Sequence, residues 1–530
     1  MTLSQRRIAT ILASTVVALH TTAHAQSNNL CDEPGEAPDL IVGDIATKTR
    51  WGSVGEITAF SLGISSCSIG SCWLDWKAST PEHPVMGQNM FRLGNGRFEQ
   101  IGQSWLFHAF FTLSNTLCST GCIATDGTHL GVRCSNTDSA SFGGYQPRLG
   151  PKFEVDPSSG VFPFPFTGIN QNGDPIYKRL QVHAADLDPA LNPGALYFAE
   201  AQFVTRDDAA AGNLTNNASY RPITVTGSGS FDFALTGSTV RMKPAIEAWK
   251  TIDPEVALTY APVPGDGRFI VGARVTATPA GYHYEYAVQN FDAHRAGALF
   301  TVPIPEGGIV SGVGFHDVDY HSGEPFSGTD WTATSGGGSI VWTTETYAEN
   351  QNANALRWGT LYNFRFDSPA PPLEGQIVLG LFRPGVPGEI AVSTLVPCHG
   401  GDLDADARTS ACDCDDSNAE VWATPGEASA LALHHDPVNG TTLSWSGPSN
   451  PGGVATSYDA MRSTDPSDFV NAATCLPSPD PTSLTRTDAL DPMPGGLFVY
   501  LVRATNACPA GSGPLGASAS GVPRAGRGCP

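Results

Sequence analysis

The stretch MFRLGNGRFEQI, residues 90–101, predicts a β-hairpin. Alternating segments flank Asn95-Gly96, and both of these residues tolerate the positive φ angles of a tight hairpin turn. The surrounding residues, 31–230, contain further short apolar runs that are broken by Gly, Pro and Asn. This region is therefore expected to be an N-terminal β-rich domain with disulfides.

Residues 231–395 contain seven more strand-like runs with turn residues between them. That number and spacing predict a β-sandwich, so the chain should hold two consecutive sandwich-like units. The runs are RFIVGARVTAT (268–278), YHYEYAVQNF (282–291), GALFTVPIP (297–305), GGIVSGVGFHDVDYH (307–321), SIVWTTETY (339–347), TLYNFRF (360–366) and QIVLGLF (376–382).

The composition supports a mainly β chain and excludes several classes of protein. The 530 residues include 58 Gly and 41 Pro, which interrupt helices too often for a helical bundle. With 10 Trp, 13 Tyr and 25 Phe the chain can build hydrophobic cores, so it is not disordered. The 51 acidic residues outnumber the 29 basic ones and give a net charge of −22, so no nucleic acid partner is expected.

The first 25 residues have the features of a cleaved signal peptide. Arg6 and Arg7 precede a short apolar run, and Ala23-His24-Ala25 forms a cleavage site that would make Gln26 the mature start. No other apolar run is long enough for a membrane span. The 12 cysteines, six between 31 and 134 and six between 398 and 529, fit an oxidising compartment, so a secreted or cell-surface protein is expected.

Residues 398–426 form an acidic, cysteine-containing segment that predicts a calcium site. Three carboxylates alternate at its start, and a fourth stands at the twelfth position of a loop that begins at Asp402. Calcium takes six to eight oxygen ligands, which such a loop can supply. Two further aspartates add charge or serve a second ion. The predicted metal ligands are Asp402, Asp404, Asp406, Asp413, Asp415 and Asp416.

The last 130 residues resemble two modules of secreted bacterial proteins. GDLDADARTSACDCDDSNAEVWATPGE (401–427) is similar to an Asp-rich metal-binding motif of the DCDD type, although Ala407 and Asp413 depart from an EF-hand loop. TLSWSGP, YDAMRS, ATCLP and VYLVRATNACPAGSGPLG resemble a fibronectin type III-like module, which implies a further sandwich over residues 427–524. Within it we predict a Cys475–Cys508 disulfide, since both cysteines lie in strand-edge segments. Residues 31–395 resemble secreted bacterial proteins through FRLGNGRFEQIGQSWL, HDVDYHSGEP and NANALRWGTLYNF, a resemblance that implies no activity.

Histidines and carboxylates of the two β units are the remaining candidates for chemistry. If residues 316–321 form a strand, Asp317, Asp319 and His321 share one face, as His283 and Glu285 do in the run 282–286. These five residues are the catalytic candidates. Neutral imidazoles bind copper or iron well, so a second metal site is considered at His108, His183, His316 and His321.

These residues leave three functions open, and they do not decide whether the chain is an enzyme. The first is a secreted calcium-binding protein that binds an extracellular polymer or surface component. Trp73, Trp76, Trp331 and Trp342 would then either fill sandwich cores or present rings to sugars. The second is an oxidoreductase that uses copper, iron or another transition metal at the histidines. The third is a glycan-active hydrolase with Asp317, Asp319 or Glu285 as acid and base.

Overall fold

The computed structural model describes residues 31, 35–168, 171–321, 323–406, 408–410, 412–509, 511–517 and 522–529; the expected signal peptide lies outside these residues. The described part is mainly β, as the sequence predicts. None of its helices has the length and apolar character that crossing a membrane would need. The helices are α1 (Ala140–Gly143), α2 (Ala184–Leu187), α3 (Arg206–Ala211) and α4 (Glu247–Ile252), with 3-10 turns η1 (Gln146–Arg148), η2 (Lys152–Glu154) and η3 (Leu214–Asn216).

An 11-stranded sheet, here called the large sheet, forms the N-terminal part. Its main path runs β1 (Leu40–Val54), β2 (Ile57–Ser68), β10 (Leu180–His183), β5 (Arg97–Gln103), β4 (Val85–Gly94), β11 (Leu196–Val204), β12 (Ala218–Thr226) and β13 (Asp232–Leu235). The short strands β6 (Leu106–His108), β8 (Ser135–Asp138) and β9 (Leu149–Gly150) pair at its side, and β3 (Leu74–Asp75) pairs with β7 (His129–Leu130) separately. Since β13 belongs to this sheet, the sheet extends five residues beyond position 230.

The hairpin that the sequence predicts is the β4–β5 pair. Gly94 pairs with Arg97, and the two residues between them, Asn95 and Gly96, have φ angles of 52° and 78°. These are the positive values that a two-residue hairpin turn requires. The turn fixes the register that places Phe91 and Phe98 inside a core and Arg97 and Glu99 at a junction described below.

Two five-stranded sheets form a sandwich from β14 to β23. One sheet runs β14 (Ala257–Pro262), β15 (Arg268–Thr278), β16 (Gly281–Asn290), β21 (Thr360–Ser368) and β18 (Ser311–His316); the other runs β19 (Thr332–Gly336), β20 (Ser339–Thr343), β17 (Gly297–Pro303), β22 (Pro372–Leu381) and β23 (Glu389–Pro397). Trp331 and Trp342 are buried between them, and Trp76 is buried in the core of the large sheet. Trp73 stacks on His129. Three of the four tryptophans therefore fill cores.

The large sheet and the sandwich share hydrophobic clusters. Phe98 of β5 and Phe198 of β11 pack with Trp249 of α4, Ile270 of β15 and Leu361 of β21. Polar bonds also cross this junction: Gln100 accepts a hydrogen bond from the Leu361 backbone N–H at 2.7 Å. The two β units are thus joined by a common interior.

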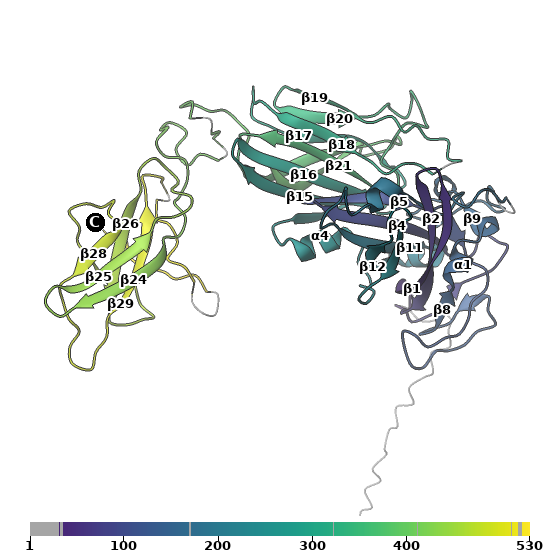
Figure 1. The fold of residues 1–530 in the computed structure, drawn as a ribbon, viewed down its shortest axis with the longest axis horizontal. Helices are drawn as coiled ribbons and strands as arrows, with labels where there is room; N and C mark the ends of the chain where they lie inside the picture. The colour runs from purple at the N-terminus through teal and green to yellow at the C-terminus, as the bar shows by residue number, and fades with distance from the viewer. Residues whose placement is uncertain are drawn as a thin grey trace, which may run out of the picture.

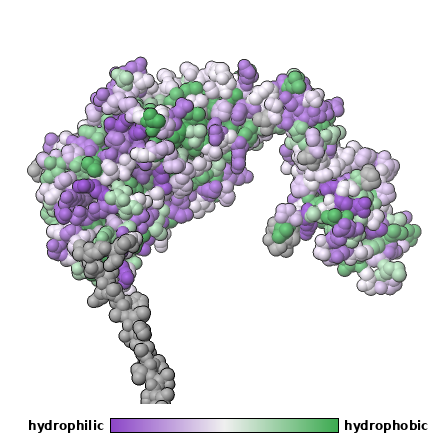
Figure 2. Space-filling view, turned by 180° about the vertical axis from the view of Figure 1, so that it is seen from behind, coloured by the Kyte–Doolittle hydropathy of each residue, from purple (hydrophilic) through white to green (hydrophobic). Residues whose placement is uncertain are grey.

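The C-terminal unit holds two three-stranded sheets and stands apart from the other sheets (Figure 1). They are β24 (Ser429–Asp436), β25 (Gly440–Ser446) and β28 (Thr485–Asp488), and β27 (Thr474–Cys475), β26 (Ser457–Ser463) and β29 (Val499–Thr505). Leu443, Trp445 and Tyr500 pack between them in a small core. The view from behind shows the same separation, with a narrow neck of chain between the two bodies (Figure 2).

All 12 cysteines are paired, in one closed set near each end of the chain. The disulfides are Cys31–Cys72, Cys67–Cys118, Cys122–Cys134, Cys398–Cys412, Cys414–Cys508 and Cys475–Cys529. The predicted Cys475–Cys508 bond is therefore wrong. Cys475 lies in β27 and Cys508 follows β29, and β26 separates these two strands. Two strand spacings are about 10 Å, which is too far for a disulfide.

Candidate functional site

The Asp-rich loop connects β23 of the sandwich to β24 of the C-terminal unit. Cys398–Cys412 closes the segment that contains Asp402, Asp404 and Asp406. Cys414–Cys508 then fixes the following residues to the C-terminal unit. The loop is thus held by a covalent bond on each side of Asp413.

Three aspartates of this loop turn their carboxylates toward one another. Ligand oxygens of Asp402, Asp404 and Asp406 lie within 4.8 Å of one another, and this is the only such group of three or more His, Cys, Asp or Glu side chains among the described residues. The Oδ1 atoms of Asp404 and Asp406 accept backbone N–H bonds from Asp406 and Arg408, at 3.2 and 2.7 Å. Asp413 Oδ1 accepts from Asp415 N at 2.8 Å in the same way. The loop backbone therefore orients each of these carboxylates through a single oxygen.

The second oxygens of these carboxylates have no hydrogen-bond partner in the described part of the chain. Oδ2 of Asp404, Asp406 and Asp413 are each buried and accept no hydrogen bond from the described residues. Burial raises the pKa of Asp406, and the charges of Asp404 and Asp413 raise it further. Arg408 is the nearest basic residue in sequence, but its guanidinium stacks on the Trp422 ring at 3.8 Å. The convergent carboxylate oxygens of Asp402, Asp404 and Asp406 are hard ligands of the kind that a divalent cation prefers.

Asp415 and Asp416 have other contacts. Asp415 Oδ1 accepts from the Ser417 hydroxyl at 2.7 Å, and Asp416 Oδ1 accepts from the Leu403 backbone at 3.2 Å. Neither of them, nor Asp413, is in the group of convergent ligands. Asp416 thereby links the two ends of the loop.

A cleft of about 600 Å³ lies between the large sheet and the sandwich. It contains most of the other candidates, including His183, His316, Asp317, Asp319 and His321. The shared strand face that the sequence predicts for residues 317–321 does not form, because β18 ends at His316. Residues 317–321 lie outside any strand.

Asp317, Asp319 and His321 each contact a different part of the protein. Asp317 accepts from Asn354 of the sandwich at 2.5 Å, and burial raises the pKa of Asp317 to about 6. Asp319 contacts His183 of β10 at 2.7 Å. His321 Nε2 donates to the Arg179 carbonyl at 2.8 Å. The segment therefore connects the two β units across the cleft.

The four histidines considered for a second metal are not brought together. His183, His316 and His321 line the cleft, whereas His108 is buried elsewhere against His83, with 3.0 Å between their ring nitrogens. His108 also stacks on Phe166 at 3.7 Å. It is placed as a core residue because strand β6 carries it inward.

His283 and Glu285 share a face of β16, as the sequence predicts, but they belong to an ion-pair chain outside the cleft lining. His283 contacts Glu285 at 3.4 Å and Asp367 at 2.6 Å, and these carboxylates raise its pKa, with Glu285 the larger cause. Glu285 pairs with Arg97 of the large sheet at 3.0 Å. Arg97 also contacts Glu99. This pairing indicates a role in holding the junction.

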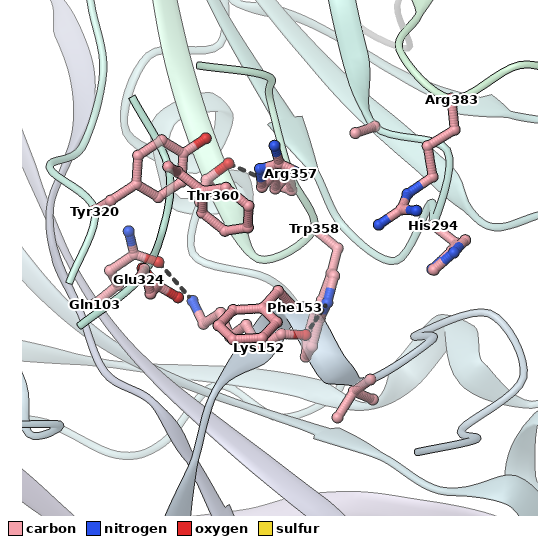
Figure 3. A pocket seen from close by; sticks show the side chains of 13 residues that line it. Gln103, Lys152, Phe153, His294, Tyr320, Glu324, Arg357, Trp358, Thr360 and Arg383 are labelled. Atoms are coloured by element: carbon pink, nitrogen blue, oxygen red, sulfur yellow. Dashed lines mark hydrogen bonds between the residues drawn. The ribbon is translucent and has the colours of Figure 1, made fainter. Parts of the chain in front are cut away.

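Sequence reasoning missed the basic side chains of the junction. Lys152, Arg357 and Arg383 line a second pocket there, together with Glu324 (Figure 3). In the sequence, Lys152 (in PKFEV) and Arg357 (in ALRWG) are isolated basic residues, and no regular spacing marks either of them as part of a site. Only the packing of one unit on the other reveals their proximity.

No family model matches this chain, and no curated protein matches it. Among solved structures, it is similar to the BSP domain of a biofilm-associated protein, at 9% identity over 90% of this chain and 80% of that one, with a TM-score of 0.14. It is also similar to a structure described as manganese lipoxygenase of Gaeumannomyces graminis with partial zonadhesin of Komagataella pastoris, at 11% identity over 68% of this chain and 93% of that one, with a TM-score of 0.17. Likenesses this weak identify no function.

Proposed function

We propose that this chain is a secreted calcium-binding β protein that acts as an extracellular or surface binding protein. One observation supports it above all: the buried Oδ2 atoms of Asp404, Asp406 and Asp413, which no described residue satisfies. A buried polar atom without a hydrogen bond is costly unless it finds another partner, and a bound metal ion is one such partner. Six disulfides favour an oxidising, extracellular compartment.

Calcium would take one oxygen from each of Asp402, Asp404, Asp406 and Asp413. Backbone carbonyls and water would complete its six to eight ligands. Magnesium should fit poorly, since it demands a tighter octahedron and keeps its own water. The bound ion would neutralise the loop and make the connection between the sandwich and the C-terminal unit more rigid.

Thermal unfolding of the mature protein tests this proposal. Calcium should raise the melting temperature of the C-terminal transition relative to EGTA, because a ligand that binds only the folded state stabilises by RT ln(1 + [L]/Kd). Millimolar Mg²⁺ should give a much smaller shift. The variant Asp404→Asn/Asp406→Asn should lose the calcium effect.

The control is Glu374→Gln/Asp491→Asn, which removes the same charge from exposed positions outside the loop. It should keep the calcium shift. An equal shift in the loop variant, or none in the wild type, would make the segment an ordinary acidic linker.

Glycan hydrolysis in the cleft is the second candidate function. It is favoured by the different surroundings of two carboxyls: Asp317 has a pKa of about 6 through burial, while the Asp319 side chain is 77% exposed. An acid and a base need such contrast. Release of reducing sugar that falls about 100-fold or more in both Asp317→Asn and Asp319→Asn would support it; unchanged release in either variant would refute it. The dispersed histidines make the metal oxidoreductase the weakest of the three functions.

A further inference from the structure

A small pocket at the junction between the large sheet and the sandwich gathers basic side chains (Figure 3). Lys152 comes from η2 beside the large sheet, Arg357 precedes β21, and His294 and Arg383 flank the strands β17 and β22. The free space is about 30 Å³, room for a guest of only a few atoms. Phe153 and Phe326 form apolar walls.

Lys152 is 6% exposed, and its hydrogen-bond partners among the described residues are neutral. Its ammonium donates to Gln103 Oε1 at 2.9 Å and, less closely, to the Gly359 carbonyl at 3.3 Å and Asn89 Oδ1 at 3.4 Å. Burial lowers the pKa of Lys152 to about 8, although the charges of Glu324 and Glu200 oppose this shift; neither carboxylate forms an ion pair with the ammonium in the described part of the chain. A buried lysine without a paired carboxylate is costly.

The two arginines are also incompletely satisfied. Arg383 makes no side-chain hydrogen bond or ion pair with any described residue, and its Nε is buried. Arg357 Nη2 donates to the carbonyls of Gln351 and Ala353, but its Nε is buried without a partner. Burial lowers the pKa of Arg357, and the charge of Arg383 lowers it further.

His294 belongs to the same group of basic side chains. Burial lowers its pKa, and the charge of Arg383 adds to this, although Asp156 lies 3.8 Å from its Nδ1. Glu324 is the acidic residue of the lining; burial raises the pKa of its carboxyl to about 7, and the charge of Lys152 opposes this rise. In a chain of net charge −22, two neighbouring arginines that form no ion pair with a described residue are a local exception.

We propose that this pocket binds a small monovalent oxyanion, of the size of formate or nitrate, between Arg357 and Arg383. The planar guanidinium presents several N–H donors in a fixed geometry that matches a planar oxyanion. Lys152 adds positive potential from the opposite wall. The anion thereby balances the buried charges at the contact between the two β units. This site does not depend on the calcium loop, and each can fail alone.

Calorimetric titration of the mature protein with sodium formate and sodium nitrate, in gluconate buffer, tests the proposal. One anion should bind per chain, and the bulky benzoate should not compete. Arg383→Gln should weaken binding at least about tenfold, as expected for loss of a hydrogen bond to a charged group. Lys250→Gln, which removes an exposed positive charge outside the pocket lining, should bind like the wild type.

A second variant keeps the proposal testable if Arg383→Gln fails to fold. Arg383→Lys keeps the charge but loses the guanidinium geometry, so it should bind nitrate with an affinity between those of the wild type and Arg383→Gln. The absence of saturable formate or nitrate binding to the wild type would overturn the proposal. So would binding that Arg383→Gln and Arg383→Lys leave unchanged, or benzoate binding as tight as that of formate.

Discussion

His83 and His108 form a buried pair that should make stability depend on pH. Their ring nitrogens lie 3.0 Å apart, so one ring must donate a hydrogen bond and the other must accept it. The accepting ring must therefore be neutral. Burial lowers the pKa of His83 to about 4 and that of His108 well below its usual value. A lowered folded-state pKa gives stability that is present above the unfolded value of about 6.5 and is lost as the pH falls toward the folded value.

We therefore expect the free energy of unfolding to fall by about 3 kcal/mol between pH 7 and pH 4 through His83 alone. Urea unfolding across this range measures it. His83→Gln/His108→Gln carries no titrating ring, and its stability should approach that of the wild type as the pH falls. A constant difference between the two proteins at every pH would contradict this account of the pair.

At the scale of elements, Trp358 joins the sandwich to the large sheet. It precedes β21 yet packs in a cluster with Val85, Leu106 and Phe162 of the N-terminal part. Its Nε1 donates to the Lys152 carbonyl at 3.1 Å. Trp358 thus belongs to the sandwich by sequence but packs in a hydrophobic cluster of the N-terminal part.

Trp358→Ala should lower the free energy of unfolding of both β units by about 3–5 kcal/mol, the usual cost of truncating a buried aromatic residue. Denaturant unfolding followed by circular dichroism provides the measurement. Trp73→Ala, at a half-buried ring that stacks on His129, should cost much less. Equal losses in the two variants would mean that the Trp358 contact does not hold the junction.

The elements themselves were more predictable than their assembly. The Asn95-Gly96 turn is a local signal, because two adjacent residues determine the positive φ angles that the hairpin needs. The Asp-rich loop is equally local, since alternating carboxylates in a short closed loop must lie close together. The partners of Cys475 and Cys508 depend on strand order, which no spacing along the chain expresses. The cleft and the basic pocket depend on how one β unit packs on another, so the sequence pattern could name His183 and Asp319 but not their contact.

For the whole molecule, the shared clusters predict how the chain unfolds. Hydrophobic residues of the large sheet and the sandwich occupy common clusters, while the C-terminal unit has a core of its own. Scanning calorimetry should show one transition for residues 35–397 together and a separate one for the C-terminal unit. Separate transitions for the large sheet and the sandwich would contradict the common interior.

The Asp-rich loop lies between these two bodies, and direct titration tests the proposed calcium binding most simply. Isothermal calorimetry of the mature protein, depleted of metal with EGTA and exchanged into calcium-free buffer, should show one calcium ion bound per chain through the Asp402–Asp413 loop, with little heat from magnesium. Asp404→Asn/Asp406→Asn should abolish this binding, and Glu374→Gln/Asp491→Asn should leave it intact. Absence of saturable calcium binding to the wild type, or binding that survives in the loop variant, would contradict the account.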